Sequence, residues 1–286
     1  LVGSEMCIRD SRSGIMLPKT IRHLKGEDLK DAIPDKLYIP LTDIRMLTKV
    51  DLLMLEMLAN CNWERPLYLA ISVGSVSKLK FDNYFVQEGL AFRFTPFDYK
   101  KWGDVGENRL YAVDVERLYD NVMNRYKYGG LDTPGLYLDE TTLRTCWYHR
   151  RLFAQLAKEL IAQGDNERAK KVLAYAEQVI PGYNVPETHE SGSYDIATAY
   201  AALGEKTKAV TLAVHLIAEA EDYINWAFSL KGNRIEMVRN DCIYKFWQWN
   251  QYNELLKKID GEKYKESNRQ FEEKYALFAP TMNYKN

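Results

Sequence analysis

The sequence lacks the features that mark nucleic-acid-binding and membrane-spanning chains. Its 39 basic residues are balanced by 40 acidic residues and form no basic stripe, which argues against an electrostatic nucleic-acid footprint. No apolar run approaches the roughly 18 residues that a membrane helix requires. The longest candidate, residues 209–218, is interrupted by Thr211 and His215. We therefore expect a water-soluble chain that binds no nucleic acid.

Cysteine and histidine are too few and too scattered to indicate a disulfide framework or a metal site. The cysteines are widely spaced, and the four histidines are isolated. His189 and Glu190 are not followed by a second histidine at helical spacing, so the zinc protease motif is absent. Residues 74–78 lack the spacing of a phosphate loop, and no G-x-S-x-G elbow occurs. We predict no catalytic, cofactor-binding or metal-ligating residue.

The first third of the chain shows mixed periodicity. Residues 1–12 have neither periodicity nor signal-peptide order and resemble translated adapter read-through, so we expect a sequencing artefact and a missing true N-terminus. Residues 13–35 are typical of a linker. Residues 36–132 alternate between strand and helix patterns, which predicts a small α/β domain. The predicted strands are 37–41, 67–73 and 92–97, of which 67–73 is expected to be buried. The predicted helices are 48–60, 81–88 and 114–126. The first helix is expected to be capped by Thr48 and Asp51 and covered on two sides, and the last to be ended by Gly129-Gly130.

Beyond a Pro- and Gly-containing boundary at 132–139, residues 139–280 show only the helical period. Gly164 and Ala169 recur 40 residues later as Gly204 and Ala209. Glycine permits the tight turn of a helix hairpin and alanine permits close helix packing, as in tetratricopeptide repeats of 34 residues with a longer loop. A third unit is expected with Asn250 at its turn. The predicted fold class is therefore α+β and mostly α: a small α/β domain followed by a tetratricopeptide-like helical repeat.

Two places could hold a ligand. At the first, Trp63, Glu64 and Arg65 precede the strand that contains Tyr68. A guanidinium stacked on the indole and paired with a carboxylate suits a sugar or peptide, and equally suits an ion pair that fixes the helix to the strand. Glu88 and Arg93, which flank the next turn, invite the same two interpretations.

The second place is the exposed face of the first helix of each repeat pair, at 143–162 and 188–203. Its rim carries Tyr183, His189 and Glu190 on a loop longer than the repeat requires. Long loops often carry function, yet they are also where insertions cost least. If a ligand binds here, an extended polypeptide acceptor is expected, because a nearly neutral, tyrosine-rich chain suits peptide or glycan better than phosphate.

A family resemblance rests on several patches in a fixed order. They are Asn62-Trp63-Glu64-Arg65-Pro66-Leu67-Tyr68, Tyr84-Phe85, residues 88–93 (EGLAFR), Tyr119-Asp120-Asn121, residues 129–132 (GGLD) and residues 137–140 (YLDE). Together they resemble the C-terminal region of multi-pass bacterial membrane proteins of the protein O-mannosyltransferase-like type. The resemblance covers roughly residues 15–280, and tetratricopeptide-like helices follow in that family too.

The resemblance implies a role beside a glycosyltransferase. The family is similar to enzymes that use lipid-linked sugars, whose catalytic acids lie among N-terminal membrane helices that this chain lacks. The implied role is an accessory, non-catalytic domain for acceptor or partner recognition. It would lie on the periplasmic (extracytoplasmic) face, tethered to the inner membrane by the membrane-embedded N-terminal portion of the same protein. The alternative is a free-standing tetratricopeptide-type interaction scaffold.

Overall fold

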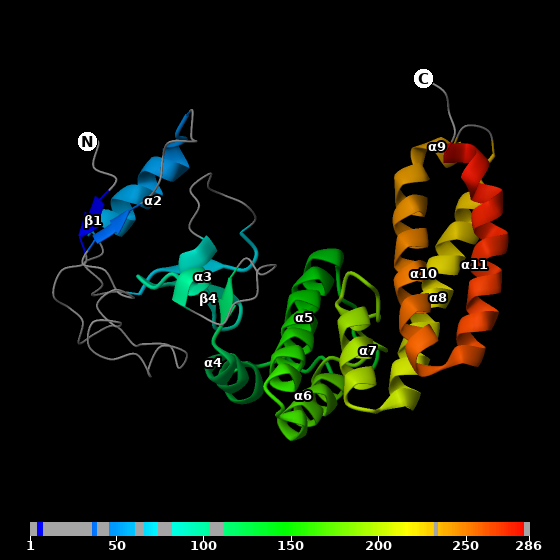
Figure 1. Ribbon diagram of the computed structural model, residues 1–286, viewed down its shortest axis with the longest axis horizontal. Helices are drawn as coiled ribbons and strands as arrows, with labels where there is room; N and C mark the ends of the chain where they lie inside the picture. The colour runs from blue at the N-terminus through cyan, green and yellow to red at the C-terminus, as the bar shows by residue number, and fades with distance from the viewer. Residues whose placement is uncertain are drawn as a thin grey trace. The chain divides into compact units, whose positions relative to one another are not determined.

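The computed structural model describes residues 5–7, 36–38, 46–60, 66–73, 82–102, 111–231 and 234–282. It divides into two compact units, Leu1–Tyr126 and Lys127–Asn286, called here the first and second unit (Figure 1). The structure is 68% helical with one small four-stranded sheet, so the predicted α+β, mostly α class is confirmed. The predicted domain limits, 36–132 and 139–280, stay predictions.

The first unit is built on a four-stranded sheet of order β3-β5-β4-β6. Strand β5 is antiparallel to both β3 and β4, and β6 joins β4 in parallel. The core beside this sheet includes Val86 and Leu118, both almost fully buried. The elements are β1 (Glu5–Cys7) paired with β2 (Lys36–Tyr38), α2 (Lys49–Asn60), β3 (Tyr68–Ala70), η3 (Asp82–Tyr84), β4 (Phe85–Gln87), β5 (Ala91–Phe94), α3 (Tyr99–Trp102), β6 (Ala112–Val113), α4 (Val115–Asp120) and η4 (Asn121–Arg125).

The helix predicted over 81–88 is wrong. A short 3₁₀ turn is followed there by β4, which forms a hairpin with β5 around Gly89. The signal for this hairpin was a glycine between two short apolar runs, which favours a turn between strands over the end of a helix. The strand predicted over 67–73 exists as β3, but it is an edge strand with Tyr68 51% exposed, so its predicted burial is also wrong.

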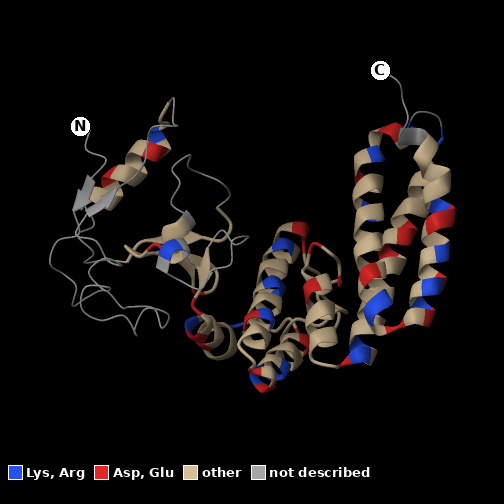
Figure 2. Ribbon diagram, in the orientation of Figure 1, with Lys and Arg blue, Asp and Glu red and all other residues tan. Residues whose placement is uncertain are grey.

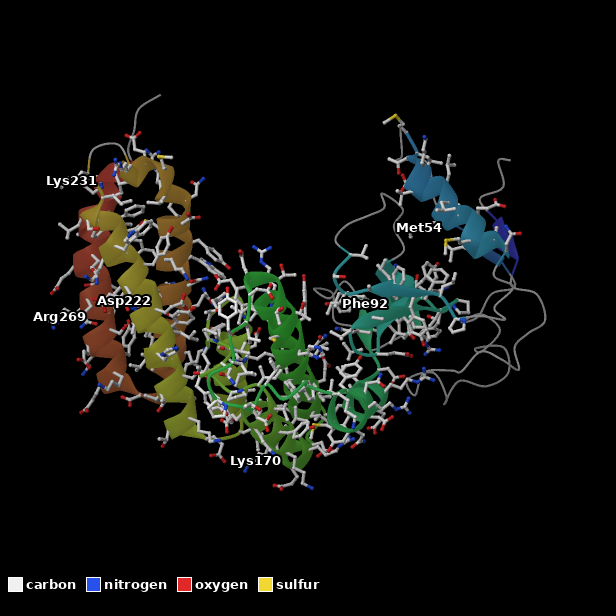
Figure 3. All side chains as sticks on the ribbon, turned by 180° about the vertical axis from the view of Figure 1, so that it is seen from behind. Met54, Phe92, Lys170, Asp222, Lys231 and Arg269 are labelled. Carbon is white, nitrogen blue, oxygen red and sulfur yellow. The ribbon has the colours of Figure 1, made fainter. Side chains whose placement is uncertain are left out.

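Helix α2 begins with the predicted capping box. The Thr48 backbone N–H donates to Asp51 Oδ2 over 2.7 Å, and the Asp51 N–H donates to Thr48 Oγ1 over 3.3 Å. The expected coverage on two sides is wrong, because Leu52 and Leu53 are more than half exposed while Leu58 is buried. On the sheet, the Phe92 ring packs edge-on against Tyr111 at 4.5 Å between centroids (Figure 3).

The second unit contains only helices among its described elements. Both acidic and basic residues occur along these helices (Figure 2). The Arg269 side chain points outward (Figure 3), whereas Lys274 of the same helix lies 3.3 Å from Glu221 of a neighbouring helix. The helices are α5 (Glu140–Ala162), α6 (Asn166–Val179), α7 (Ser193–Ala202), α8 (Lys206–Ser229), α9 (Arg234–Met237), α10 (Arg239–Ile259) and α11 (Gly261–Met282). Pairs α5–α6, α7–α8 and α10–α11 pack as hairpins.

The first two hairpins turn in the same way, 40 residues apart. Gly164 and Gly204 have φ angles of 79° and 78°, in the left-handed region that glycine tolerates. The residue after each glycine donates its N–H to a carbonyl five residues earlier, over 2.9 Å in both hairpins. Ala169 and Ala209 are fully buried where the helices meet. Whether these hairpins are tetratricopeptide repeats stays a prediction.

The turn predicted at Asn250 is wrong. Asn250 lies inside α10, and the third hairpin turns ten residues later at Asp260. Nothing at Asn250 interrupts the helix, because Phe246, Trp249 and Leu256 continue one buried stripe. The helix predicted over 114–126 is confirmed as α4 and η4, which together span Val115–Arg125. The helical conformation ends at Tyr126, before the two glycines expected to stop it.

Candidate functional site

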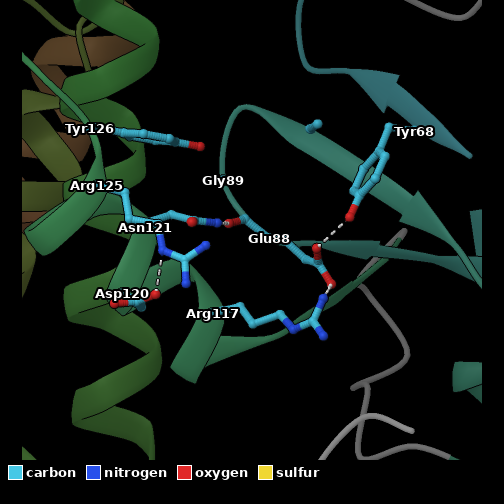
Figure 4. A pocket seen from close by; sticks show the side chains of 9 residues that line it. Tyr68, Glu88, Gly89, Arg117, Asp120, Asn121, Arg125 and Tyr126 are labelled. Carbon is cyan, nitrogen blue, oxygen red and sulfur yellow. Dashed lines mark hydrogen bonds and ion pairs between the residues drawn. The ribbon is translucent and has the colours of Figure 1, made fainter. Parts of the chain in front are cut away.

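The first unit contains a pocket of about 520 Å³ beside the β4–β5 hairpin turn. One wall is the turn together with Tyr68 of β3, and the other wall is formed by α4, η4 and the residue that follows them (Figure 4). The lining residues are Tyr68, Glu88, Gly89, Ala91, Arg117, Asp120, Asn121, Arg125 and Tyr126. The pocket thus joins a sheet edge to a helix within one unit.

Glu88 is the centre of the polar network in this pocket. Its side chain is buried, and its Oε1 lies 2.6 Å from Arg93 Nε and 2.7 Å from Arg117 Nη1. The Tyr68 hydroxyl donates to Glu88 Oε2 over 3.2 Å. Burial, assisted by the Glu88 charge, raises the pKa of Tyr68, so this phenol stays a hydrogen-bond donor. In Figure 4 the side chains of Tyr68, Glu88 and Arg117 point toward one another.

The hairpin turn is held against the helix by close contacts at Gly89. This glycine has a φ of +152°, and a Cβ added to it would lie 2.1 Å from the Tyr126 hydroxyl oxygen. That hydroxyl accepts from the Leu90 N–H over 3.0 Å, and the Asn121 side-chain amide donates to the Glu88 carbonyl over 2.6 Å. The glycine is required both by its backbone conformation and by the approach of the tyrosine.

The helical wall changes its winding where it meets the pocket. Residues Asn121–Arg125 form a π-helical turn that continues α4, and π-helical turns occur frequently at functional sites. The turn contributes Asn121 and Arg125 to the lining and is followed by Tyr126. Arg125 Nε lies 2.7 Å from Asp120 Oδ2, and both side chains are well exposed. The Arg125 guanidinium is therefore reachable from solvent.

This arrangement is suited to binding through hydrogen bonds. It offers carboxylate oxygens, guanidinium donors, an amide and phenol groups within one concave surface. In the part of the chain that the structure describes, no group of three or more His, Cys, Asp or Glu residues could hold a metal ion. Across the same residues, no helix is both long and apolar enough to cross a membrane.

The structure brings together three of the residues singled out from the sequence. Tyr68 and Arg93 are direct partners in the β3–β5 register, and Glu88 bridges to both. Trp63, Glu64 and Arg65 lie outside the described residues. Sequence reasoning missed Arg117, Asn121 and Arg125. The available signal was the Tyr119-Asp120-Asn121 patch, which contributed to the family resemblance without being assigned to a site.

The predicted rim residues of the second unit are engaged within that unit. The exposed Tyr183 donates its hydroxyl to the Asp132 carbonyl over 2.6 Å. His189 Nδ1 lies 2.9 Å from the Tyr252 hydroxyl, and Glu190 accepts from the Gln248 side chain over 3.0 Å. His189 also belongs to a ring cluster from the loop, α7 and α10. The ring cluster consists of His189, Tyr194, Tyr244, Trp247 and Tyr252.

The loop that carries these rim residues is held in place by hydrogen bonds from Arg150 of α5. This side chain is 3% exposed, and its two terminal nitrogens donate to four acceptors of the loop. The acceptors are the carbonyls of Ile180 (3.0 Å), Val185 (2.6 Å) and Pro186 (2.8 Å) and the Ser191 hydroxyl (3.1 Å). Burial lowers the pKa of Arg150 to about 10. No local pattern in the sequence predicted a buried charged residue here.

The fold and the pocket define a class: a small sheet unit with a polar binding pocket, followed by stacked helix hairpins. Residues 19–116 match the family model of TMEM260-associated domain 2. The match includes the hairpin side of the pocket and ends one residue before Arg117. No curated protein and no solved structure matches the chain.

Proposed function

We propose that this chain is an accessory recognition region of a membrane O-glycosyltransferase-like protein of the protein O-mannosyltransferase type, and that it is not itself catalytic. The observation that carries the proposal is the match of residues 19–116 to TMEM260-associated domain 2. In this proposal the chain is a C-terminal domain on the periplasmic, extracytoplasmic face. A membrane-embedded portion of the same protein performs the sugar transfer.

The second unit supports the recognition of an acceptor polypeptide. Tyr244 and Trp247 lie one helical turn apart on α10, are 45% and 49% exposed, and stack at 5.6 Å between ring centroids. Their other neighbour is His189, whose loop is held rigidly by Arg150. Exposed aromatic rings on a rigid support are typical of protein-binding surfaces, because they bury much area with little loss of conformational entropy.

A second candidate function is a free-standing interaction scaffold. The identical turns of the α5–α6 and α7–α8 hairpins favour it, because repeated helix pairs offer extended binding surfaces in tetratricopeptide proteins. Both functions use the same exposed rings, so the residues of the chain do not distinguish between them. The two functions differ in what precedes the chain in its gene. Upstream segments encoding hydrophobic membrane helices would support the accessory region. A start codon near residue 13 would support the scaffold.

The proposal is tested with the full chain, a fluorescently labelled Ser/Thr-rich peptide and a lipid-linked hexose donor. We expect fluorescence anisotropy to detect peptide binding and mass spectrometry to detect no hexose on the peptide. Sugar transfer by the isolated chain would contradict the non-catalytic role. The absence of peptide binding would contradict acceptor recognition.

A matched pair of substitutions locates the peptide. Trp247 of α10 and Trp226 of α8 are both 49% exposed, so Trp247→Ala and Trp226→Ala remove equal ring surface at different places. Trp247→Ala is expected to weaken peptide binding about tenfold, as the loss of an aromatic anchor does. Trp226→Ala is expected to leave it unchanged. Equal effects of the two substitutions would mean that the ring cluster is not the binding surface.

A further inference from the structure

The charges of the described residues that line the pocket of the first unit balance. The two acids that line it, Glu88 and Asp120, are matched by Arg117 and Arg125. Two charged residues outside the lining also balance each other. Arg93 pairs with Glu88, and Asp114 Oδ2 lies 3.6 Å from Arg117 Nε. A site for phosphate or carboxylate needs an excess of cations, and a site for a metal or amine needs an excess of anions. Neither excess is present among the pocket residues that the structure describes.

What the pocket offers instead is an alternation of donors and acceptors. Arg125 extends donors beside the Asp120 carboxylate, and Arg117 does so beside Glu88. A pair of this kind matches two adjacent hydroxyl groups, because each hydroxyl donates to a carboxylate oxygen and accepts from a guanidinium N–H. The half-exposed ring of Tyr68 supplies an aromatic face at the pocket edge. A pyranose ring presents hydroxyls at its rim and C–H groups on its faces.

The size and rigidity of the pocket fit the same kind of ligand. Its volume of about 520 Å³ lies within the range of about 300–1,000 Å³ that is usual for small-molecule sites. The hairpin wall is fixed to the helical wall by Asn121 and Tyr126, so the two walls keep their spacing without a ligand. A preformed site is needed for a sugar, since hydroxyl groups gain little free energy on leaving water.

We propose that the pocket of the first unit binds a neutral pyranose, with the Asp120–Arg125 pair holding two adjacent hydroxyls and the Tyr68 ring covering one face of the sugar. This inference rests on the proposed function and deepens it. It places glycan recognition in the first unit, separate from peptide recognition by the ring cluster in the second. The chain would then recognise an acceptor that already carries a sugar.

Isothermal titration of the full chain with small ligands tests the inference. The ligands are a set of neutral methyl hexopyranosides, the corresponding methyl uronates, methyl 2-amino-2-deoxyhexosides and inorganic phosphate. At least one neutral hexoside is expected to bind with a dissociation constant of about 1 mM, which corresponds to about −4 kcal/mol. The charged ligands are expected to bind at least fivefold more weakly than that hexoside. Tighter binding of a uronate or of phosphate, or no binding of any neutral hexoside, would overturn the proposal.

Substitutions with a matched control tie the binding to the pocket. Arg125→Gln and Tyr68→Ala are each expected to weaken hexoside binding about tenfold, or about 1.4 kcal/mol. The control Arg144→Gln removes another exposed arginine from an ion pair, outside the pocket, and is expected to change nothing. Arg125 is exposed, so the Arg125→Gln chain is expected to melt at the same temperature as the parent. Unchanged hexoside affinity in Arg125→Gln would exclude the Asp120–Arg125 pair as the site.

The two proposals fail in different ways. If the chain binds the Ser/Thr-rich peptide through Trp247 but binds no neutral hexoside, the sugar site is wrong and the recognition of an acceptor polypeptide stands. If it transfers hexose from the lipid-linked donor, the accessory function is wrong, whichever sugar the pocket binds.

Discussion

Each unit contains a buried charged residue, and the two units surround it with different kinds of hydrogen-bond partner. In the first unit, Glu88 is surrounded by the side chains of Tyr68, Arg93 and Arg117, and two of these three side chains also line a pocket. In the second unit, Arg150 donates to three main-chain carbonyls and one hydroxyl within a closed loop. One network reaches solvent and the other does not.

This difference separates a binding site from a structural clamp. Side-chain partners around Glu88 can exchange a hydrogen bond with a ligand, because Arg117 is partly exposed at the pocket surface. Main-chain acceptors around Arg150 are fixed by the loop that they belong to and leave no room for exchange. Burial of a charge therefore indicates function only where its partners also meet an open surface.

Arg150→Met is expected to cause the largest loss of stability. It removes the Arg150 hydrogen bonds to the Ile180, Val185 and Pro186 carbonyls, while Ser191 Oγ keeps its bond from the Thr188 N–H. We expect a loss of roughly 3 kcal/mol in the free energy of unfolding. Urea denaturation followed by tryptophan fluorescence measures this, because four of the chain's six tryptophans lie on α5, α8 and α10 of the second unit. Arg144→Gln on the same helix is the control, with an expected change within about 0.5 kcal/mol. Equal losses in both variants would refute the clamp.

Gly89→Ala is expected to have the next largest effect, in the first unit. The added methyl group would overlap the Tyr126 hydroxyl, and the backbone conformation is one that alanine rarely adopts. We expect a loss of about 2–3 kcal/mol. Tyr126→Phe should recover part of this loss in the double variant, because it removes the overlapping oxygen. A double variant that is as unstable as the sum of its single variants would show that the tyrosine is not the cause.

Gly164→Ala and Gly204→Ala are expected to cost about 1 kcal/mol each, and equally. At both positions the added Cβ meets nothing within 4 Å, so only the left-handed backbone conformation opposes alanine. Thermal denaturation of the two variants in parallel measures the difference. Unequal costs would mean that the two hairpins do not share one turn geometry, and a cost close to that of Gly89→Ala would contradict the steric argument at Gly89.

The smallest expected effect is a pH dependence confined to the second unit. Burial lowers the pKa values of His149 and His189 below the ordinary 6.5. The unfolded chain then binds more protons than the folded chain, so stability is complete above pH 6.5 and falls as the pH drops toward the lowered values. Denaturation at pH 7.5 and pH 5.5 should show this loss, and replacing both histidines by glutamine should reduce it. An unchanged difference would assign the pH dependence to other groups.

Local sequence signals predicted the helical unit well and the sheet unit poorly. Gly164 and Gly204 act through the conformation of their own backbone, so their 40-residue spacing was enough to predict two turns. The β4–β5 hairpin depends on pairing between segments, and its short strands carry too little periodicity to distinguish them from a helix. The edge position of Tyr68 follows from strand order, which no local pattern contains.

The pocket could be predicted only in part. Tyr68, Glu88 and Arg93 stood out because charged and aromatic residues flank short apolar runs. Arg117 and Arg125 were not singled out from the sequence, where they are charged residues within the helix predicted over 114–126. Their role depends on the π-helical turn and on Gly89, which bring the helix against the hairpin turn. Contacts that arise from two segments meeting in space are not encoded in either segment alone.

The central claim is that a sugar binds in the first unit while the helices of the second unit serve another purpose. Hydrogen–deuterium exchange of the full chain, with and without a saturating neutral methyl hexopyranoside, tests it directly. We predict slower exchange of the amides in residues 85–94 and 117–126, which form the two walls of the pocket, and no change in α10. Protection confined to α10, or no protection in either wall of the pocket, would contradict the account.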